Sequence, residues 1–198
     1  MCFDFRTSIN TYIFALISSI YLWNRNNPSD RWFTMFGLTF SSMQLIDALF
    51  HKYLDNKRIN RILSIIGFFI IFLEPLTNNV GGILYGNKNI FIYSTLLYVL
   101  YLFYIIIFKY PDEKDLNTTK DYNLQWNWLR KISTNDWLIF LFFLGMPSLF
   151  YSTPKNYICF IGGLFAFLYA YFVSGLRQTG SLWCLLINLL YVGVILAY

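Results

Sequence analysis

Two carboxyl groups of this 198-residue chain lie inside long apolar stretches, where their chemistry is unexpected. Asp47 follows Gln44 by three positions, and Glu74 directly precedes Pro75. A carboxylate at the middle of a bilayer costs at least about 2.5 kcal/mol on insertion scales, so such acids usually face a bundle interior and mark ion or proton paths. The sequence therefore predicts ion or proton sites at Asp47 and Glu74.

Other polar residues recur at helical spacing around these two acids. His51 is four positions after Asp47, and Asn78 is four positions after Glu74; the last apolar stretch carries Ser181 and Asn188 in the same way. Residues at such intervals share one face of a helix. If the three stretches are neighbours, their polar faces line a column that leads from one membrane surface past the midplane. This column comprises Gln44, Asp47, His51, Glu74, Asn78, Ser181 and Asn188.

A purely structural interpretation of these residues stays open. Polar side chains inside a membrane bundle also serve as interhelical hydrogen bonds that hold the helices together. His51, which stands beside Lys52, is either a boundary residue or a proton-relay partner for Asp47. Pro75 should kink or break its helix, which would free backbone carbonyl groups near Glu74.

The elements that must position these residues are apolar helices. Of all residues, 57% are hydrophobic and only 13% are charged, against roughly 25% charged in soluble domains. An apolar stretch of roughly 18 residues can cross the hydrocarbon layer as a helix. The sequence thus predicts an all-α, single-domain bundle of seven transmembrane helices, at residues 8–23, 32–50, 62–85, 90–108, 137–152, 157–174 and 182–198.

Aromatic residues near the ends of these stretches are expected at the membrane interfaces, as Trp and Tyr usually are. They are Trp23, Trp32, Tyr110, Trp137 and Tyr198. The longest connection, residues 110–136, contains Trp126, Trp128, Leu129 and Ile132 beside two cations. We expect this segment at the headgroup level, either as a surface helix or as a loop.

The positive charges predict the orientation. Eleven Lys and Arg residues fall on the side of the N-terminus and four on the other side, and loops rich in these residues stay in the cytoplasm. The N-terminus is therefore expected inside and the C-terminus outside, and Asn117, in an Asn-Thr-Thr acceptor sequence, should carry no glycan. Membrane lipids explain the net charge of +5, so no nucleic-acid partner is predicted, and the oligomeric state is left open.

Motifs of soluble enzymes are missing from the sequence. There is no Gly-rich phosphate loop, no Gly-x-Ser-x-Gly motif and no second histidine to complete a metal pair. The three cysteines show no spacing typical of a zinc site. We therefore predict neither a cofactor nor a metal.

Four short motifs of the chain recur together in one known family. They are Asn27–Trp32, Met43-Gln44-x-x-Asp47, Glu74-Pro75-Leu76 and Gly180-Ser181-Leu182-Trp183-Cys184. With these motifs the chain resembles an uncharacterised family of small multi-span proteins found in large DNA viruses of algae and protists and in some bacteria. The family pattern has an acid, usually Glu, three positions after the Gln, and Gly-Ser-x-Trp-Cys at the start of the last span. This chain has Asp47 at the first position and Glu74 where Gln is expected. The resemblance implies topology and a viral or host membrane, and no particular activity.

Together these observations favour a small transporter or channel whose polar, acid-containing interior conducts protons, ions or a small solute. Two other classes remain as alternatives. One is a membrane-embedded enzyme that modifies lipids, with Asp47, Glu74 and His51 as acid and base groups. The other is a scaffold protein of a viral or cellular membrane, without turnover.

Overall fold

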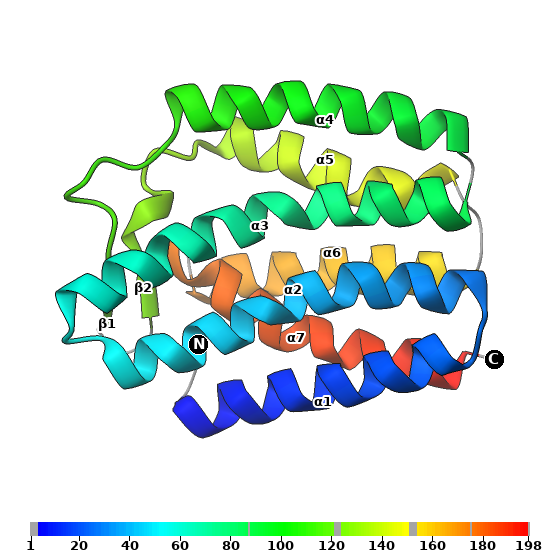
Figure 1. Ribbon diagram of the computed structural model, residues 1–198, viewed down its shortest axis with the longest axis horizontal. Coiled ribbons are helices and arrows are strands. Elements are labelled where there is room, and N and C mark those ends of the chain that lie inside the picture. Colours follow the sequence, from blue (N-terminus) through cyan, green and yellow to red (C-terminus); the bar gives the residue numbers. More distant parts are fainter. Residues whose placement is uncertain (1–3, 87, 121–123, 151–153, 175, 198) are drawn as a thin grey trace.

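The structure is a computed structural model that describes residues 4–86, 88–120, 124–150, 154–174 and 176–197. Within these residues the chain forms seven α-helices, which confirms the predicted all-α class (Figure 1). The helices are α1 Phe5–Asn24, α2 Pro28–Tyr53, α3 Lys57–Tyr85, α4 Lys88–Phe108, α5 Thr134–Phe150, α6 Pro154–Ser174 and α7 Leu176–Leu196. Each helix coincides with one of the seven predicted stretches, apart from a few residues at its ends.

Three of the helices are long and apolar enough to cross a membrane, namely α2, α3 and α4. The continuous apolar parts of α5 and α6 are shorter, at Thr134–Gly145 and Cys159–Val173. The molecule also carries many large apolar side chains on its outside; on α4, for example, Leu100 is 65% and Ile107 66% exposed. Apolar surface of this extent marks a membrane or protein contact, and it is compatible with integration into a membrane.

The first three helices begin where the sequence supplies capping residues. The side chains of Asp4, Asn27 and Asn56 accept hydrogen bonds from backbone N–H groups in the first turns of α1, α2 and α3. Such caps satisfy N–H groups that have no partner within the helix. Pro28 occupies the first turn of α2, where its missing N–H costs nothing.

Helix α2 lies at the centre of the bundle. It packs against α1, α3 and α7, while α4 packs against α3 and α5, and α6 packs against α5 and α7 (Figure 1). The polar column predicted from the sequence required α2, α3 and α7 to be neighbours. The structure places α2 between the other two, so that α3 and α7 face different sides of it.

Helix α3 continues without a break from Lys57 to Tyr85, with Pro75 inside it. Of the two outcomes predicted for Pro75, a kink or a break, the structure rules out the break. The glycines that follow serve close packing: a Cβ atom on Gly81 would lie 2.4 Å from Cδ1 of Trp32, and one on Gly82 would lie 2.5 Å from Cγ of Phe91. These two glycines allow α2 and α4 to approach the backbone of α3.

The connection between α4 and α5 folds onto one end of the bundle. It contains an antiparallel pair of short strands, β1 Thr118–Lys120 and β2 Leu124–Trp126, followed by the 3₁₀ turn η1 Asn127–Leu129. Trp126 and Trp128 are fully buried and belong to the hydrophobic core. The surface-helix form of the prediction is wrong, because the segment forms strands and a 3₁₀ turn and its two indole rings insert into the bundle. We call residues 110–120 and 124–133 the cap, and the end of the bundle that they cover the capped end.

Candidate functional site

The polar residues of α2 lie beneath the cap. Asp47 is fully buried and accepts a hydrogen bond from Nε1 of Trp126, at 3.3 Å. The ring of Trp126 stacks on that of Trp128, with centroids 5.1 Å apart. Gln44, one turn before Asp47, is also fully buried. The predicted column is therefore covered at this end by the indole of Trp126, which the sequence did not place near Asp47.

The cap is fixed to α3 by one asparagine. The side chain of Asn60 donates a hydrogen bond to the carbonyl oxygen of Thr118 and accepts one from the N–H of Thr118, both at 2.8 Å. Nε1 of Trp128 lies 3.3 Å from Oγ1 of Thr118. A Cβ atom on Gly67 would lie 3.2 Å from the ring of Trp128. The ring of Trp128 thus packs closely against α3 at this glycine.

Ion pairs hold the outer part of the cap. Nζ of Lys131 lies 2.8 Å from Asp112, and Nη1 of Arg130 lies 3.1 Å from Asp115. The hydrogen bond from Lys131 holds the pKa of Asp112 below its usual value. Arg61 of α3 pairs with Glu113 in the same region. These contacts are largely exposed, and exposed pairs contribute roughly 0–1 kcal/mol each, so the buried Asn60 contact carries more of the attachment.

The remaining members of the predicted column lie in different places. His51 is partly buried at the capped end. The pKa of Asp4 is lowered chiefly by the hydrogen bond from the N–H of Thr7, and the charge of His51 lowers it further. Asn188 is buried on α7. Ser181 is in the first part of α7, and its side chain lies outside the described residues. The position of His51 agrees with the boundary interpretation.

Glu74 occupies a separate layer of the molecule. Its side chain is 1% exposed, and among the described residues its Oε1 atom has no hydrogen-bond partner. It faces α4, where Tyr98 lies within electrostatic range of its carboxyl group. Ser94, one turn away on the same face of α4, is 1% exposed and likewise has no partner for its hydroxyl group among the described residues.

A row of hydroxyl groups leads along α4 from the level of Glu74 to the capped end. Tyr98 donates a hydrogen bond to the carbonyl oxygen of Phe72 at 2.6 Å, and Tyr101 donates one to that of Asp136 at 2.8 Å. The two rings have centroids 5.7 Å apart. The carboxyl group of Asp136 in turn lies 3.1 Å from Nζ of Lys109. The row therefore connects the surroundings of Glu74 with a charged pair beside the cap.

Asp47 and Glu74 do not form a pair. Gly67 of α3 faces Met43 and Ile46 of α2, which places Asp47 near the level of Gly67. Glu74 is seven residues farther along α3, a rise of roughly 10 Å at about 1.5 Å per residue. The contacts also differ, since Asp47 meets the cap and Glu74 meets α4. The described residues therefore do not bring the two acids together in one site.

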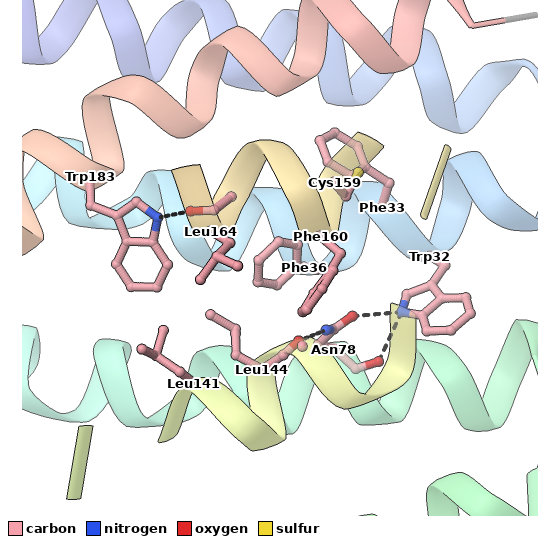
Figure 2. Close-up of a pocket in the computed structure, with 12 residues that line it drawn as sticks. Trp32, Phe33, Phe36, Asn78, Leu141, Leu144, Cys159, Phe160, Leu164 and Trp183 are labelled. Carbon is pink, nitrogen blue, oxygen red and sulfur yellow. Dashed lines mark hydrogen bonds between the residues drawn. The ribbon is translucent and has the colours of Figure 1, made fainter. Parts of the chain in front are cut away.

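Asn78 acts as a link between helices. Its Nδ2 atom donates to the carbonyl oxygen of Leu144 on α5 at 2.8 Å, and its Oδ1 atom accepts a hydrogen bond from Nε1 of Trp32 on α2, also at 2.8 Å (Figure 2). The contacts of Asn78 agree with the structural interpretation, in which it is a hydrogen bond between helices.

Trp32 is 4% exposed, so the prediction that it anchors the membrane interface is wrong. Trp137 is equally buried, against Phe140 and Phe167, and the same correction applies.

The motif that leads into α2 is structural. Nε of Arg25 lies 3.1 Å from Oδ2 of Asp30, whose side chain is fully buried. The guanidinium group of Arg31 lies 5.2 Å from the ring centroid of Trp23. From the sequence both arginines were expected only as charges at helix boundaries, and the buried ion pair was not predicted. The one available signal was an acid placed in the first turn of a capped helix.

An apolar cavity lies between α2, α3, α5, α6 and α7. Its volume is about 80 Å³, which is smaller than the roughly 300–1,000 Å³ of cavities that bury a drug-sized ligand. Figure 2 shows Asn78 and Trp32 at one side of it and Trp183 at the other. The lining residues are Trp32, Phe33, Phe36, Asn78, Leu141, Leu144, Gly145, Cys159, Phe160, Gly163, Leu164 and Trp183. Neither Asp47 nor Glu74 is among them.

Comparison with known proteins adds no relative: no protein family, curated protein or solved structure matches this chain. The resemblance to the viral and bacterial multi-span proteins therefore stays a prediction. Among the described residues, no three His, Cys, Asp or Glu side chains lie close enough together to hold a metal ion.

Proposed function

We propose that this chain is an integral membrane protein whose seven helices all cross the bilayer, with the capped end in the cytoplasm. The distribution of residues supports this arrangement. Large apolar side chains cover the outside, whereas Asp30, Gln44, Asp47, Glu74 and Asn79 are 0–1% exposed. Charged and polar groups inside a membrane bundle face its interior in the same way. The positive charges of the cap and of the adjacent helix ends agree with a cytoplasmic location.

Within this framework we propose a small transporter or channel with Glu74 as its proton or cation site. The observation that carries the proposal is the fully buried carboxyl group with an oxygen that no described residue hydrogen-bonds. Packing alone would be served by Ser, Asn or Gln at a lower cost, and an ionisable residue at this depth marks a transport path more often than a structural contact. Glu74 is thus a better candidate than Asn78, whose amide groups are fully used between helices.

The row of hydroxyl groups on α4 supplies the proposed route from Glu74 to the cytoplasm. Tyr98 and Tyr101 lie between Glu74 and the Lys109–Asp136 pair. Hydroxyl groups can both donate and accept hydrogen bonds, and polar side chains inside a bundle serve as steps of proton relays. Asp47 has a second role in this proposal: it holds the cap in place through Trp126.

Proton flux into proteoliposomes tests the proposal. Purified protein is reconstituted, a potassium diffusion potential is imposed, and internal acidification is followed with a pH-sensitive dye. Glu74→Gln, which keeps the size of the side chain and removes its charge, should reduce the flux to that of protein-free vesicles. The matched control is Asp112→Asn, the same change of acid to amide on the exposed cap, which should leave the flux intact.

The outcomes also separate the alternative classes. A Glu74→Gln protein that folds and conducts like the wild type would refute the role of Glu74. If wild-type vesicles conduct neither protons nor sodium or potassium ions, the transport proposal fails. Turnover of a labelled phospholipid by the wild type would then favour the lipid-modifying enzyme. A stable membrane partner without flux or turnover would favour the scaffold.

A further inference from the structure

The apolar cavity has a closed floor and an open rim. Its floor consists of Trp32, Phe33 and Phe36 on α2 and Trp183 on α7, and all four side chains are buried. Its rim belongs to α5 and α6, where Leu164 is 41% exposed. Leu141, Leu144, Gly145 and Phe160 on the same two helices are partly exposed. The cavity therefore opens sideways between α5 and α6, onto the outer surface of the bundle.

That surface is itself apolar. On α6, Phe165 is 69% and Phe172 80% exposed. In a bundle that crosses a membrane, such a surface is surrounded by the hydrocarbon chains of lipids. What stands in front of the opening is thus a layer of acyl chains.

The polar groups in the cavity wall are already used. The amide of Asn78 bonds Trp32 and Leu144, and the carbonyl oxygen of Gly163 accepts a hydrogen bond from Nε1 of Trp183 at 3.0 Å. A cavity whose remaining wall is apolar does not hold water well and accepts apolar ligands. The wall therefore fits a hydrocarbon chain and offers little to a charged headgroup or a sugar.

We propose that this cavity binds the methyl end of one acyl chain of a membrane phospholipid, which enters between α5 and α6 and ends against Trp183. The inference goes beyond the transport role of Glu74 and does not depend on it, because Glu74 does not line the cavity. It requires only that the opening between α5 and α6 face the hydrocarbon layer.

Brominated phospholipids test the site, because bromine atoms on an acyl chain quench tryptophan emission at contact distance. The protein is reconstituted in phosphatidylcholine brominated near the methyl ends of its acyl chains and, in parallel, in the unbrominated lipid. Trp183 is shielded from the outside by Phe40, Phe140 and Phe167, so a chain must enter the cavity to quench it. The quenched fraction of the tryptophan emission should fall in Trp183→Phe. It should stay constant or rise in the control Trp128→Phe, which removes a buried indole of the cap.

A second pair of variants changes the cavity itself. Cys159→Phe puts a ring into the cavity wall and should reduce the quenched fraction by the amount lost in Trp183→Phe. Ile161→Phe adds the same ring at a 51% exposed position of α6, outside the cavity, and should have no effect. Circular dichroism and the thermal midpoint check that each variant folds. If Cys159→Phe does not fold, the comparison of Trp183→Phe with Trp128→Phe still decides the question.

Two results would overturn the proposal. The first is an equal quenched fraction in the wild type and in Trp183→Phe, because it would mean that no chain reaches the floor of the cavity. The second is quenching of Trp183 by an added brominated fatty acid but not by brominated phosphatidylcholine, because it would assign the cavity to a free fatty acid. Loss of proton flux in Glu74→Gln changes neither measurement, so this proposal and the transport proposal fail independently.

Discussion

Asn60 makes the buried hydrogen bonds that attach the cap to α3, and replacing this residue gives the sharpest test of the packing described above. Asn60→Ala removes the hydrogen bonds to the N–H and the carbonyl oxygen of Thr118, and a third bond to the carbonyl oxygen of Leu54 at 3.0 Å. Thr118 is 2% exposed and Asn60 5%. Two backbone groups of Thr118 would therefore lose a partner in a place that water reaches poorly.

The cost follows from the number of groups left without a partner. A buried polar group that loses its hydrogen bond costs about 1–3 kcal/mol. Because the cap lies at the end of the bundle, water can reach Thr118 in part, and we expect a total of about 2–4 kcal/mol for the two groups. At about 1.4 kcal/mol per factor of ten, the cap should open roughly 30-fold to 700-fold more often.

Hydrogen exchange measured by mass spectrometry in detergent micelles reports this opening, because amide protons of a locally opening segment exchange in proportion to its open population. Peptides that cover β1 and β2 should exchange faster in Asn60→Ala, with α4 unchanged. Asn56→Ala is the matched control. It removes the exposed cap of α3, at about 1 kcal/mol, and leaves Thr118 untouched. Exchange of β1 in Asn60→Ala no faster than in Asn56→Ala would refute the reasoning.

Two further predictions concern other parts of the bundle. Gly82→Ala places a Cβ atom 2.5 Å from Cγ of Phe91 and should cost about 1–3 kcal/mol through overpacking; an unchanged thermal midpoint would contradict the contact between α3 and α4. Asp4 has a pKa lowered chiefly by the hydrogen bond from the N–H of Thr7, so its capping contribution is present above about pH 4 and is lost as the pH falls through the lowered value. Asp4→Asn, which caps without titrating, should therefore lose less stability than the wild type between pH 7 and pH 3, and equal losses in thermal scans would argue against this role.

The helices could be predicted from the sequence because each is an apolar stretch bounded by charged or capping residues. Asn27-Pro28 and Asn56 mark helix starts by local chemistry alone, and local chemistry needs no knowledge of neighbours. The effect of Pro75 was harder to predict. Whether a proline breaks a membrane helix depends on the contacts around it, and here the hydroxyl group of Tyr98 bonds the carbonyl oxygen of Phe72 one turn earlier.

The burial of Asp47 and Glu74 also followed from the sequence, since an acid within an apolar stretch must face inward. Their partners did not follow. Hydrophobic periodicity shows which face of a helix is buried but not which segment covers it, and so Trp126 and Trp128 were expected in the headgroup layer although they cover Asp47.

By itself, the sequence determined the seven helices, the inward polar faces and the acids on them, because spacing and hydropathy are properties of the chain. The tertiary structure alone decided that Asp47 and Glu74 belong to different layers, that the cap closes one end, and that a side-opening cavity lies between α5 and α6. These features arise where segments far apart in the chain meet, and such contacts depend on how whole helices pack.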